Sequence, residues 1–172
     1  MTERHVDLGS EGGMREFRTA LGRFITGVTV ITTIDDAGRP AGFTANSFSA
    51  LSLAPPLVLW SMQRHLPSLK AFRVGAKYAV NILAADQSDL AMRFARPAAD
   101  KFDGVAYTIG RGGCPLFEGC LARFEGHVTQ AVDGGDHVIL VGLVEWAAHR
   151  DGPPLLFSHG RLCIADVLAA AA

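Results

Sequence analysis

The segment Val28-Thr29-Val30-Ile31-Thr32-Thr33-Ile34 is β-branched at every position, which is typical of a strand. The turn Asp35-Asp36-Ala37-Gly38 follows, and residues 39–44 return as its partner strand. Further strands are expected in the apolar or alternating segments at residues 57–62, 78–83, 120–130, 137–146 and 155–157. Six or more strands, mostly joined by hairpins, predict an all-β fold built as a closed antiparallel β-barrel with peripheral helices.

Three short helices are expected beside the barrel, and they do not alternate with strands as βαβ units would require. Residues 14–24 carry apolar side chains at every third or fourth position, the spacing of an amphipathic helix. Residues 67–72 begin with proline, which favours a first helical turn, and Asp86 is expected to cap a third helix. Residues 1–13 are polar and glycine-rich and predict a flexible lead-in, so the folded domain is expected over residues 14–168.

Composition and charge argue against several classes of protein. Of the 172 residues, 49% are hydrophobic and 19% are charged, which is typical of a globular chain. The net charge is −1 and no basic run occurs, so we expect no nucleic-acid partner. The longest apolar stretch, residues 138–144, is far shorter than the ~20 residues of a membrane helix, and the polar N-terminus does not resemble a secretory signal. Three cysteines without CxxC spacing favour free thiols in the cytoplasm.

The glycine-rich segment Gly110-Arg111-Gly112-Gly113 partly matches a dinucleotide-binding fingerprint. Pro115 follows it and no helical pattern begins there, although such a fingerprint needs a helix whose N-terminus holds the pyrophosphate. We therefore predict an ordinary loop. The histidines and cysteines lack metal-ligand spacing, and no Gly-x-Ser-x-Gly motif occurs, so neither a metal site nor a serine nucleophile is predicted.

Two polar motifs remain as candidates for a binding site. Thr44 to Ser49 combine hydroxyls, one amide and small side chains, so the backbone there can approach a flat ring and donate N–H groups to it. Composition alone favours an ordinary polar loop. Gly134-Gly135-Asp136 predicts a flexible turn that places His137 at the edge of the barrel, where a lone histidine is usually structural. The strand that follows is apolar on both faces, so it is either central in the sheet or covered by a second subunit.

Taken together, Thr44 to Ser49 and Gly135-Asp136-His137, with Gly142 five residues on, resemble motifs of the flavin reductase family. This family contains the small reductase components of two-component flavin monooxygenases, and the resemblance covers residues 14–165. It implies an FMN-binding split barrel, six-stranded and in Greek-key order, that is usually a homodimer. It also implies that NADH reduces FAD or FMN, and that the reduced flavin leaves for a separate oxygenase.

The resemblance also implies which residues hold the cofactors. Ser68 lies in the first turn of the second helix, where N–H donors suit a flavin phosphate, although plain helix capping is an alternative. Arg64 is the nearest basic side chain. His137 is implied to seat NADH beside the flavin and is the candidate catalytic residue, while His159 is a weaker candidate for the nicotinamide. The flavin is expected to bind Thr44, Ala45, Asn46, Ser47, Ser49, Ser61, Gln63 and Ser68.

A third patch resembles reductases that serve antibiotic-tailoring oxygenases. It consists of residues 90–96 followed by Asp100-Lys101-Phe102. Phe94 and Phe102 are candidates to flank the flavin or nicotinamide ring, and Lys101 is a candidate cofactor contact. Phe94 at helical spacing is more often a core residue, and Lys101 is as often a solvated charge, so these alternatives stay open.

Two other functions fit a split barrel. A flavin oxidase of the pyridoxamine-phosphate oxidase kind would need a dense cluster of arginine and lysine for a substrate phosphate, which the sequence lacks. A non-enzymatic module that binds flavin or haem would not need the Gly135-Asp136-His137 motif for NADH. The flavin reductase interpretation is therefore preferred, with NADH and FAD or FMN as the expected cofactors.

Overall fold

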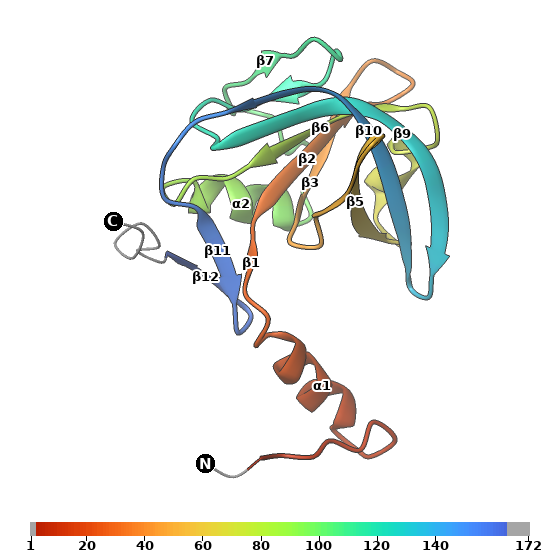
Figure 1. Cartoon of the computed structure of the whole chain (residues 1–172), viewed down its shortest axis with the longest axis vertical. Coiled ribbons are helices and arrows are strands. Elements are labelled where there is room, and N and C mark those ends of the chain that lie inside the picture. The colour runs from red at the N-terminus through yellow and green to blue at the C-terminus, as the bar shows by residue number, and fades with distance from the viewer. Residues whose placement is uncertain (1–2, 165–172) are drawn as a thin grey trace.

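The structure is a computed structural model that describes residues 3–164. Its centre is a seven-stranded antiparallel sheet in the order β3-β2-β6-β9-β10-β5-β4 (Figure 1). The strands of this sheet are β2 (Thr29–Ile34), β3 (Pro40–Ala45), β4 (Ser49–Leu53), β5 (Pro56–Gln63), β6 (Lys77–Ile82), β9 (Ala122–Gly134) and β10 (His137–His149). A mostly-β architecture, as predicted from the sequence, is confirmed.

The two edge strands of this sheet follow one another in the chain. Only residues 46–48 lie between the end of β3 and the start of β4. Ala45 and Ser49 can therefore be at most about 14 Å apart. Because the strands at opposite edges of the sheet are this close, the seven strands must curl, and the curl is visible in Figure 1. Within the described residues no hydrogen-bonded ladder joins β3 to β4, so the curled sheet is not closed by strand pairing.

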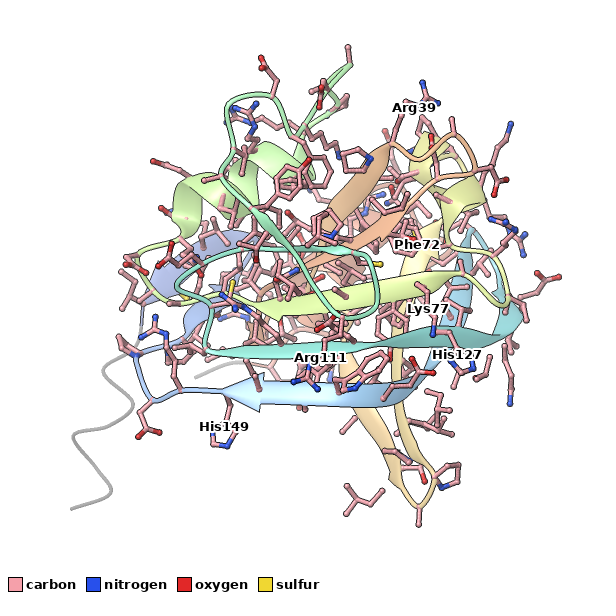
Figure 2. All side chains as sticks on the ribbon, turned by 90° about the horizontal axis from the view of Figure 1, so that it is seen from above. Arg39, Phe72, Lys77, Arg111, His127 and His149 are labelled. Atoms are coloured by element: carbon pink, nitrogen blue, oxygen red, sulfur yellow. The ribbon has the colours of Figure 1, made fainter. Side chains whose placement is uncertain are left out.

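The concave side of the curl holds the larger hydrophobic core. Phe43 from β3, Trp60 from β5, Tyr78 from β6 and Leu140 from β10 pack there with almost no exposed surface. Phe72, labelled in Figure 2, joins them with its ring centroid 5.6 Å from that of Phe43 and 6.4 Å from that of Trp60. Each fully buried side chain of this size stabilises the fold by ~1.5–3 kcal/mol relative to an exposed one, so this core makes the sheet a firm support.

Smaller elements surround the sheet. A three-stranded sheet contains β1 (Thr26–Gly27), β11 (Leu155–Ser158) and β12 (Arg161–Ile164), and a ribbon contains β7 (Thr108–Ile109) and β8 (Pro115–Leu116). The helices are α1 (Gly13–Leu21), the 3-10 helix η1 (Pro67–Ala71) and α2 (Ser88–Ala95). The three expected helices are confirmed. However, α1 ends before Phe24, and α2 starts after Gln87 without a side-chain cap, so the expected cap by Asp86 is wrong.

The strands expected from the sequence are all present, with their ends shifted by a few residues. β4, β12 and the two-residue strands were not predicted. β4 is an edge strand with four of its five side chains exposed, and Leu53 at its end is 93% exposed. A strand that buries neither face has no apolar alternation, so periodicity could not reveal it. The last residues of the expected domain, 165–168, lie outside the described part of the chain.

β10 is central in the sheet, between β9 and β5, and this position accounts for its apolar character within one chain. Gly142 lies in the middle of β10, and a Cβ placed there would be 2.4 Å from the ring of Tyr78. The hydroxyl of Tyr78 donates to the carbonyl of Leu143 at 3.2 Å, so the ring crosses directly over the glycine. Gly142 is therefore required for packing, independently of any ligand.

The ribbon β7–β8 covers the outer face of the sheet over Glu125. Its glycine-rich segment is a loop, as predicted, and the N–H of Gly112 donates to the buried Glu125 carboxylate at 2.8 Å. A Cβ at Gly110 would lie 2.2 Å from the same carboxylate, so the loop needs glycine there for close approach. Burial and the nearby charge of Glu125 raise the pKa of the Cys114 thiol to about 12, which keeps it protonated and unreactive.

Candidate functional site

The connection between β3 and β4 is the centre of the candidate site. Thr44 and Ala45 belong to β3 and Ser49 begins β4, so the predicted loop is in fact two strand ends joined by residues 46–48. The hydroxyl of Thr44 donates to the carbonyl of Ala91 in α2 at 2.6 Å, and the side chain of Ala45 is buried in the core. These two residues anchor the connection at its start.

Ser47 ties this connection to the neighbouring strand. Its hydroxyl accepts from the N–H of Ser61 at 3.0 Å and donates to the carbonyl of Ser61 at 3.2 Å. Ser61 lies in β5 two positions before Gln63, which pairs with His137 of β10. Residues two apart on a strand face the same side of the sheet and lie about 7 Å apart. β5 therefore brings the β3–β4 connection and His137 to neighbouring positions.

Two grooves meet at the exposed side chain of Asn46. The first, of about 450 Å³, lies between β3, α2 and the β11–β12 hairpin and has mostly apolar walls. The second, of about 470 Å³, lies between the segment that follows α1 and the β3–β4 connection, and it includes Ser47 and Ser49. Volumes of this size are typical of small-molecule sites. Several lining residues were not predicted from the sequence, namely Leu21, Phe24, Met92, Phe157, Arg161 and Leu162.

A third groove, of about 320 Å³, lies at the start of β3 beside η1. Ser68, in the first turn of η1, and Lys101 both line it. The ammonium of Lys101 donates to the carbonyl of Phe94 at 2.7 Å, and burial lowers its pKa. A partly desolvated ammonium beside a hydroxyl suits a bound anion, because the anion restores the lost charge stabilisation. Phe102 forms part of the wall, with its side chain almost fully buried.

Phe94 lines none of these three grooves. Its side chain is fully buried, and its ring centroid lies 4.9 Å from that of Phe102 and 5.2 Å from that of Phe117. A Cβ at Gly42 would lie 3.1 Å from the Phe94 ring, so this ring fills the space directly behind β3. The expectation that Phe94 flanks a cofactor ring is therefore corrected, because close packing leaves it no surface for such a contact. Phe94 is a core residue that supports the groove wall.

His137 stands at the tip of the β9–β10 hairpin. Its Nδ1 lies 2.7 Å from Oδ1 of Asp136, and this hydrogen bond lowers the pKa of the Asp136 carboxyl. The His137 side chain is 35% exposed, and the contact with Asp136 leaves Nε2 for a ligand. Gln63, which faces His137 across the strand pair, has an exposed side chain at the end of β5. This pair therefore offers polar groups at the rim of the sheet.

Arg64 does not point to the groove of Ser68, contrary to its expected place near a phosphate. Its Nε donates to the carbonyl of Gly135 at 2.9 Å, and its Nη2 donates to the Asp133 carboxylate at 2.6 Å. The backbone N–H of Arg64 donates to the carbonyl of Asp136 at 3.0 Å. Arg64 thus fastens the hairpin tip to the turn after β5.

His159 lies in the turn between β11 and β12, next to residues that line the first groove. Its Nδ1 is 2.7 Å from the hydroxyl of Ser158, and its Nε2 is 2.8 Å from Nη1 of Arg23. Because a guanidinium only donates, Nε2 is the acceptor and Nδ1 carries the proton. Both ring nitrogens are thus used within the chain, where they join the segment after α1 to the C-terminal hairpin.

A model of the family described as flavin reductase like domain matches residues 21–166. The chain belongs to this family. FMN reductase (NADH) SmoA of Agrobacterium fabrum is 46% identical over 160 residues, which are 93% of this chain and 91% of that protein. The reductase component of the flavin-dependent trigonelline monooxygenase of Acinetobacter baylyi is 45% identical over 77% of this chain, but the match spans only 43% of that longer protein.

A solved structure of a flavin reductase supports the same relationship. The NADH:FAD oxidoreductase SgcE6 of Streptomyces globisporus, in complex with NAD and FAD fragments, matches this structure with a TM-score of 0.88 and 34% sequence identity. The match covers 97% of this chain and 99% of SgcE6. The likeness therefore extends over the curled sheet and the elements around it.

The second groove of this flavin reductase carries polar groups of the kind that can bind a flavin. The hydroxyl of Thr26 is buried in the wall of the second groove and has no hydrogen-bond partner within residues 3–164. An unpaired buried hydroxyl costs about 1–3 kcal/mol, which a polar ligand in the groove would offset. Asn46 and Ser49 add an amide and a hydroxyl at the same opening. Thr26 was not predicted, because its burial arises only when β1 pairs with β11 far along the chain.

Within residues 3–164, no helix is both long and apolar enough to cross a membrane. In the same part of the chain, His, Cys, Asp and Glu side chains do not gather in threes as metal ligands would. Cys114, Cys120 and Cys163 are free thiols, and the first two are buried.

Proposed function

We propose that this flavin reductase oxidises NADH, reduces FAD or FMN and releases the reduced flavin to a separate oxygenase. The observation that carries the proposal is the arrangement along β5, where Ser61 holds the β3–β4 connection and Gln63 pairs with His137. The β3–β4 connection and His137 are thus two polar regions held by neighbouring residues of one strand. This arrangement suits two cofactors whose rings must come into contact for hydride transfer. The relatives named as FMN reductase (NADH) and NADH:FAD oxidoreductase support the same reaction.

The flavin ring is proposed to lie against the β3–β4 connection. Asn46, Ser49 and the unpaired hydroxyl of Thr26 offer hydrogen bonds there, and the N–H groups of residues 46–48 can donate to the ring. Ser68 and Lys101 are proposed to bind the flavin phosphate, with Phe102 as part of the wall. The residues that hold these groups in place are Thr44, Ala45, Ser47 and Ser61.

NADH is proposed to bind at the rim, with its nicotinamide against His137 and Gln63. His159, beside the first groove, is a second candidate for this contact, which its ring would make in place of the hydrogen bond to Arg23. Hydride transfer is chemistry that the bound cofactors supply. The chain's own residues are therefore proposed to orient the two rings and to exclude water, and none of them is assigned an acid or base role.

We also propose that the curled sheet is a split barrel in Greek-key order and that two copies pair. The support is a set of apolar side chains left in solvent on and after α1, which stands away from the sheet in Figure 1. Phe24 is 77% exposed, and Leu21 and Ile25 are exposed beside it. An obligate pair should bury more than ~1,500 Å² in total. Light scattering at micromolar concentration should give twice the 18.3 kDa mass of the chain, and a monomer would contradict the pairing.

The proposed setting is the cytoplasm, where three free thiols stay reduced. The proposed partner is an oxygenase that consumes reduced flavin. This proposal is supported by relatives named as reductase components of monooxygenases, including the trigonelline enzyme of Acinetobacter baylyi.

Steady-state oxidation of NADH with FAD, FMN and riboflavin, measured side by side, tests the proposed reaction. We expect NADH to be consumed only when a flavin is present. An oxidase of the pyridoxamine-phosphate kind would instead oxidise its own substrate without NADH. A non-enzymatic module would bind flavin without consuming NADH, and either result would overturn the proposal.

A further inference from the structure

The β9–β10 hairpin tip has little apolar packing to hold it. Residues 130–136 are all exposed, β9 ends at Gly134, and the turn that follows begins with Gly135, which has a positive φ of 72°. Backbone pairing holds His137 to Gly134 of β9 and to Gln63 of β5, so the part of the tip outside these ladders is the turn Gly135-Asp136. Its position matters because His137, the first residue of β10, follows directly.

Arg64 supplies a restraint from the turn after β5. Its guanidinium reaches the carbonyl of Gly135 and the carboxylate of Asp133 through two different nitrogens, and its own N–H binds the carbonyl of Asp136. Three of the four residues that precede His137 are thus bound by one residue. A guanidinium has a fixed fork geometry, so two side-chain bonds define the direction of the tip as well as its distance.

We propose that Arg64 is a positioning residue for NADH, which acts by holding the hairpin tip so that His137 faces the nicotinamide. This inference rests on the proposed role of His137. It also replaces the expectation that Arg64 binds the flavin phosphate. The groove of Ser68 is lined by His65 and Lys101 and not by Arg64, whose guanidinium already has two partners on the hairpin.

The test uses four single variants of the full chain and one double variant. Arg64→Gln removes both side-chain anchors, Arg64→Lys keeps a charge for Asp133 but loses the fork, and His137→Ala is the reference. Arg73→Gln is the matched control, because Arg73 pairs with Asp36 at a different turn and both pairs are exposed to a similar degree. The readouts are KM and kcat for NADH, the Kd values for FMN and riboflavin, and hydrogen exchange of residues 130–138.

We expect Arg64→Gln to raise KM for NADH roughly fivefold, the equivalent of about one hydrogen bond, while both flavin Kd values stay unchanged. Arg64→Lys should recover part of this loss. Exchange at the tip should become faster in Arg64→Gln and not in Arg73→Gln. In the double variant with His137→Ala, the Arg64→Gln effect on KM should largely vanish, because the two residues act as a unit.

Four results would overturn the positioning role. Unchanged exchange at the tip in Arg64→Gln would mean that Arg64 does not restrain it. Weaker binding of FMN with unchanged binding of riboflavin would make Arg64 a phosphate ligand. If His137→Ala raises KM for NADH and Arg64→Gln does not, only the positioning inference fails. If His137→Ala itself leaves kcat/KM for NADH unchanged, the proposed function of His137 fails first and the inference falls with it.

Discussion

The β3–β4 connection and the β9–β10 tip are the two polar parts of the proposed site, and the fold holds them in different ways. The connection is three residues long and is built into the sheet, with Ser47 bonded to both backbone groups of Ser61. The tip lies at the end of the β5–β10 ladder, where His137 pairs with Gln63, and its exposed turn is fastened by the side chain of Arg64. We therefore expect that changes which destabilise the sheet also weaken flavin binding, whereas changes at the tip can impair NADH use without destabilising the sheet.

The largest expected effect comes from substitution of Gly142. This residue lies on the same strand as His137 but is packed against Tyr78 inside the sheet. Gly142→Ala would place a Cβ 2.4 Å from the Tyr78 ring, and overpacking of this kind costs about 1–3 kcal/mol or more. Urea unfolding should show this loss, and flavin binding and NADH use should fall together. Gly9→Ala, in the N-terminal segment, is the control and should unfold like the original chain. A stable Gly142→Ala variant that has lost only NADH binding would contradict the packing role.

His137→Ala should separate the two parts of the site. We expect kcat/KM for NADH to fall roughly tenfold, the equivalent of about 1.4 kcal/mol, while flavin affinity stays nearly unchanged. The measurement combines flavin titration with stopped-flow reduction. His149→Ala is the matched control, since His149 lies farther along β10 and points away from the sheet (Figure 2). If His137→Ala loses flavin and yet reduces the remaining flavin normally, the residue belongs to the flavin site.

Ser68→Ala should weaken flavin binding and leave the use of NADH unchanged. Loss of one hydrogen bond to the phosphate should weaken FMN binding by about 0.5–1.5 kcal/mol, with no change in kcat once flavin is saturating. Riboflavin has no phosphate, so its Kd should be the same for Ser68→Ala and the original chain. Equal weakening of both flavins would place Ser68 near the ring instead.

The smallest expected effect is that of Thr26→Val, which should change stability and binding in opposite directions. Removal of the unpaired buried hydroxyl should stabilise the flavin-free chain by about 1 kcal/mol, the low end of the cost of such a group, because its desolvation is no longer uncompensated. The same change should weaken flavin binding by a similar amount. Thermal unfolding without flavin measures the change in stability, and the shift in unfolding temperature when flavin is added measures the change in binding. Equal stability changes in the two conditions would mean that Thr26 does not contact the flavin.

Local sequence patterns predicted much of the fold. The β-branched run before Asp35, the apolar segment of β5 and the glycine turn before His137 all mark elements that form where expected. These elements have one or two buried faces, so their apolar residues recur with the period of a strand. The same logic failed for β4, whose exposed side chains carry no such period.

The details of the site depended on contacts between distant segments. Ser47 binds Ser61, and Arg64 binds residues about seventy positions away, so neither partner could be predicted from spacing. Phe94 was a candidate cofactor contact because residues 90–96 resemble reductases that serve antibiotic-tailoring oxygenases, but the aromatic cluster that buries it also contains the distant Phe117. The sequence thus named candidate residues for the site, whereas the division of these candidates into anchors and free groups required the fold.

Anaerobic reduction tests the central claim most directly. Purified protein is mixed with FAD or FMN and then with NADH in the absence of oxygen, and flavin absorbance is followed before the sample is passed through an ultrafiltration membrane. The account predicts that the flavin absorbance bleaches and that reduced flavin appears in the filtrate. If NADH fails to bleach the flavin, the protein is not the proposed reductase.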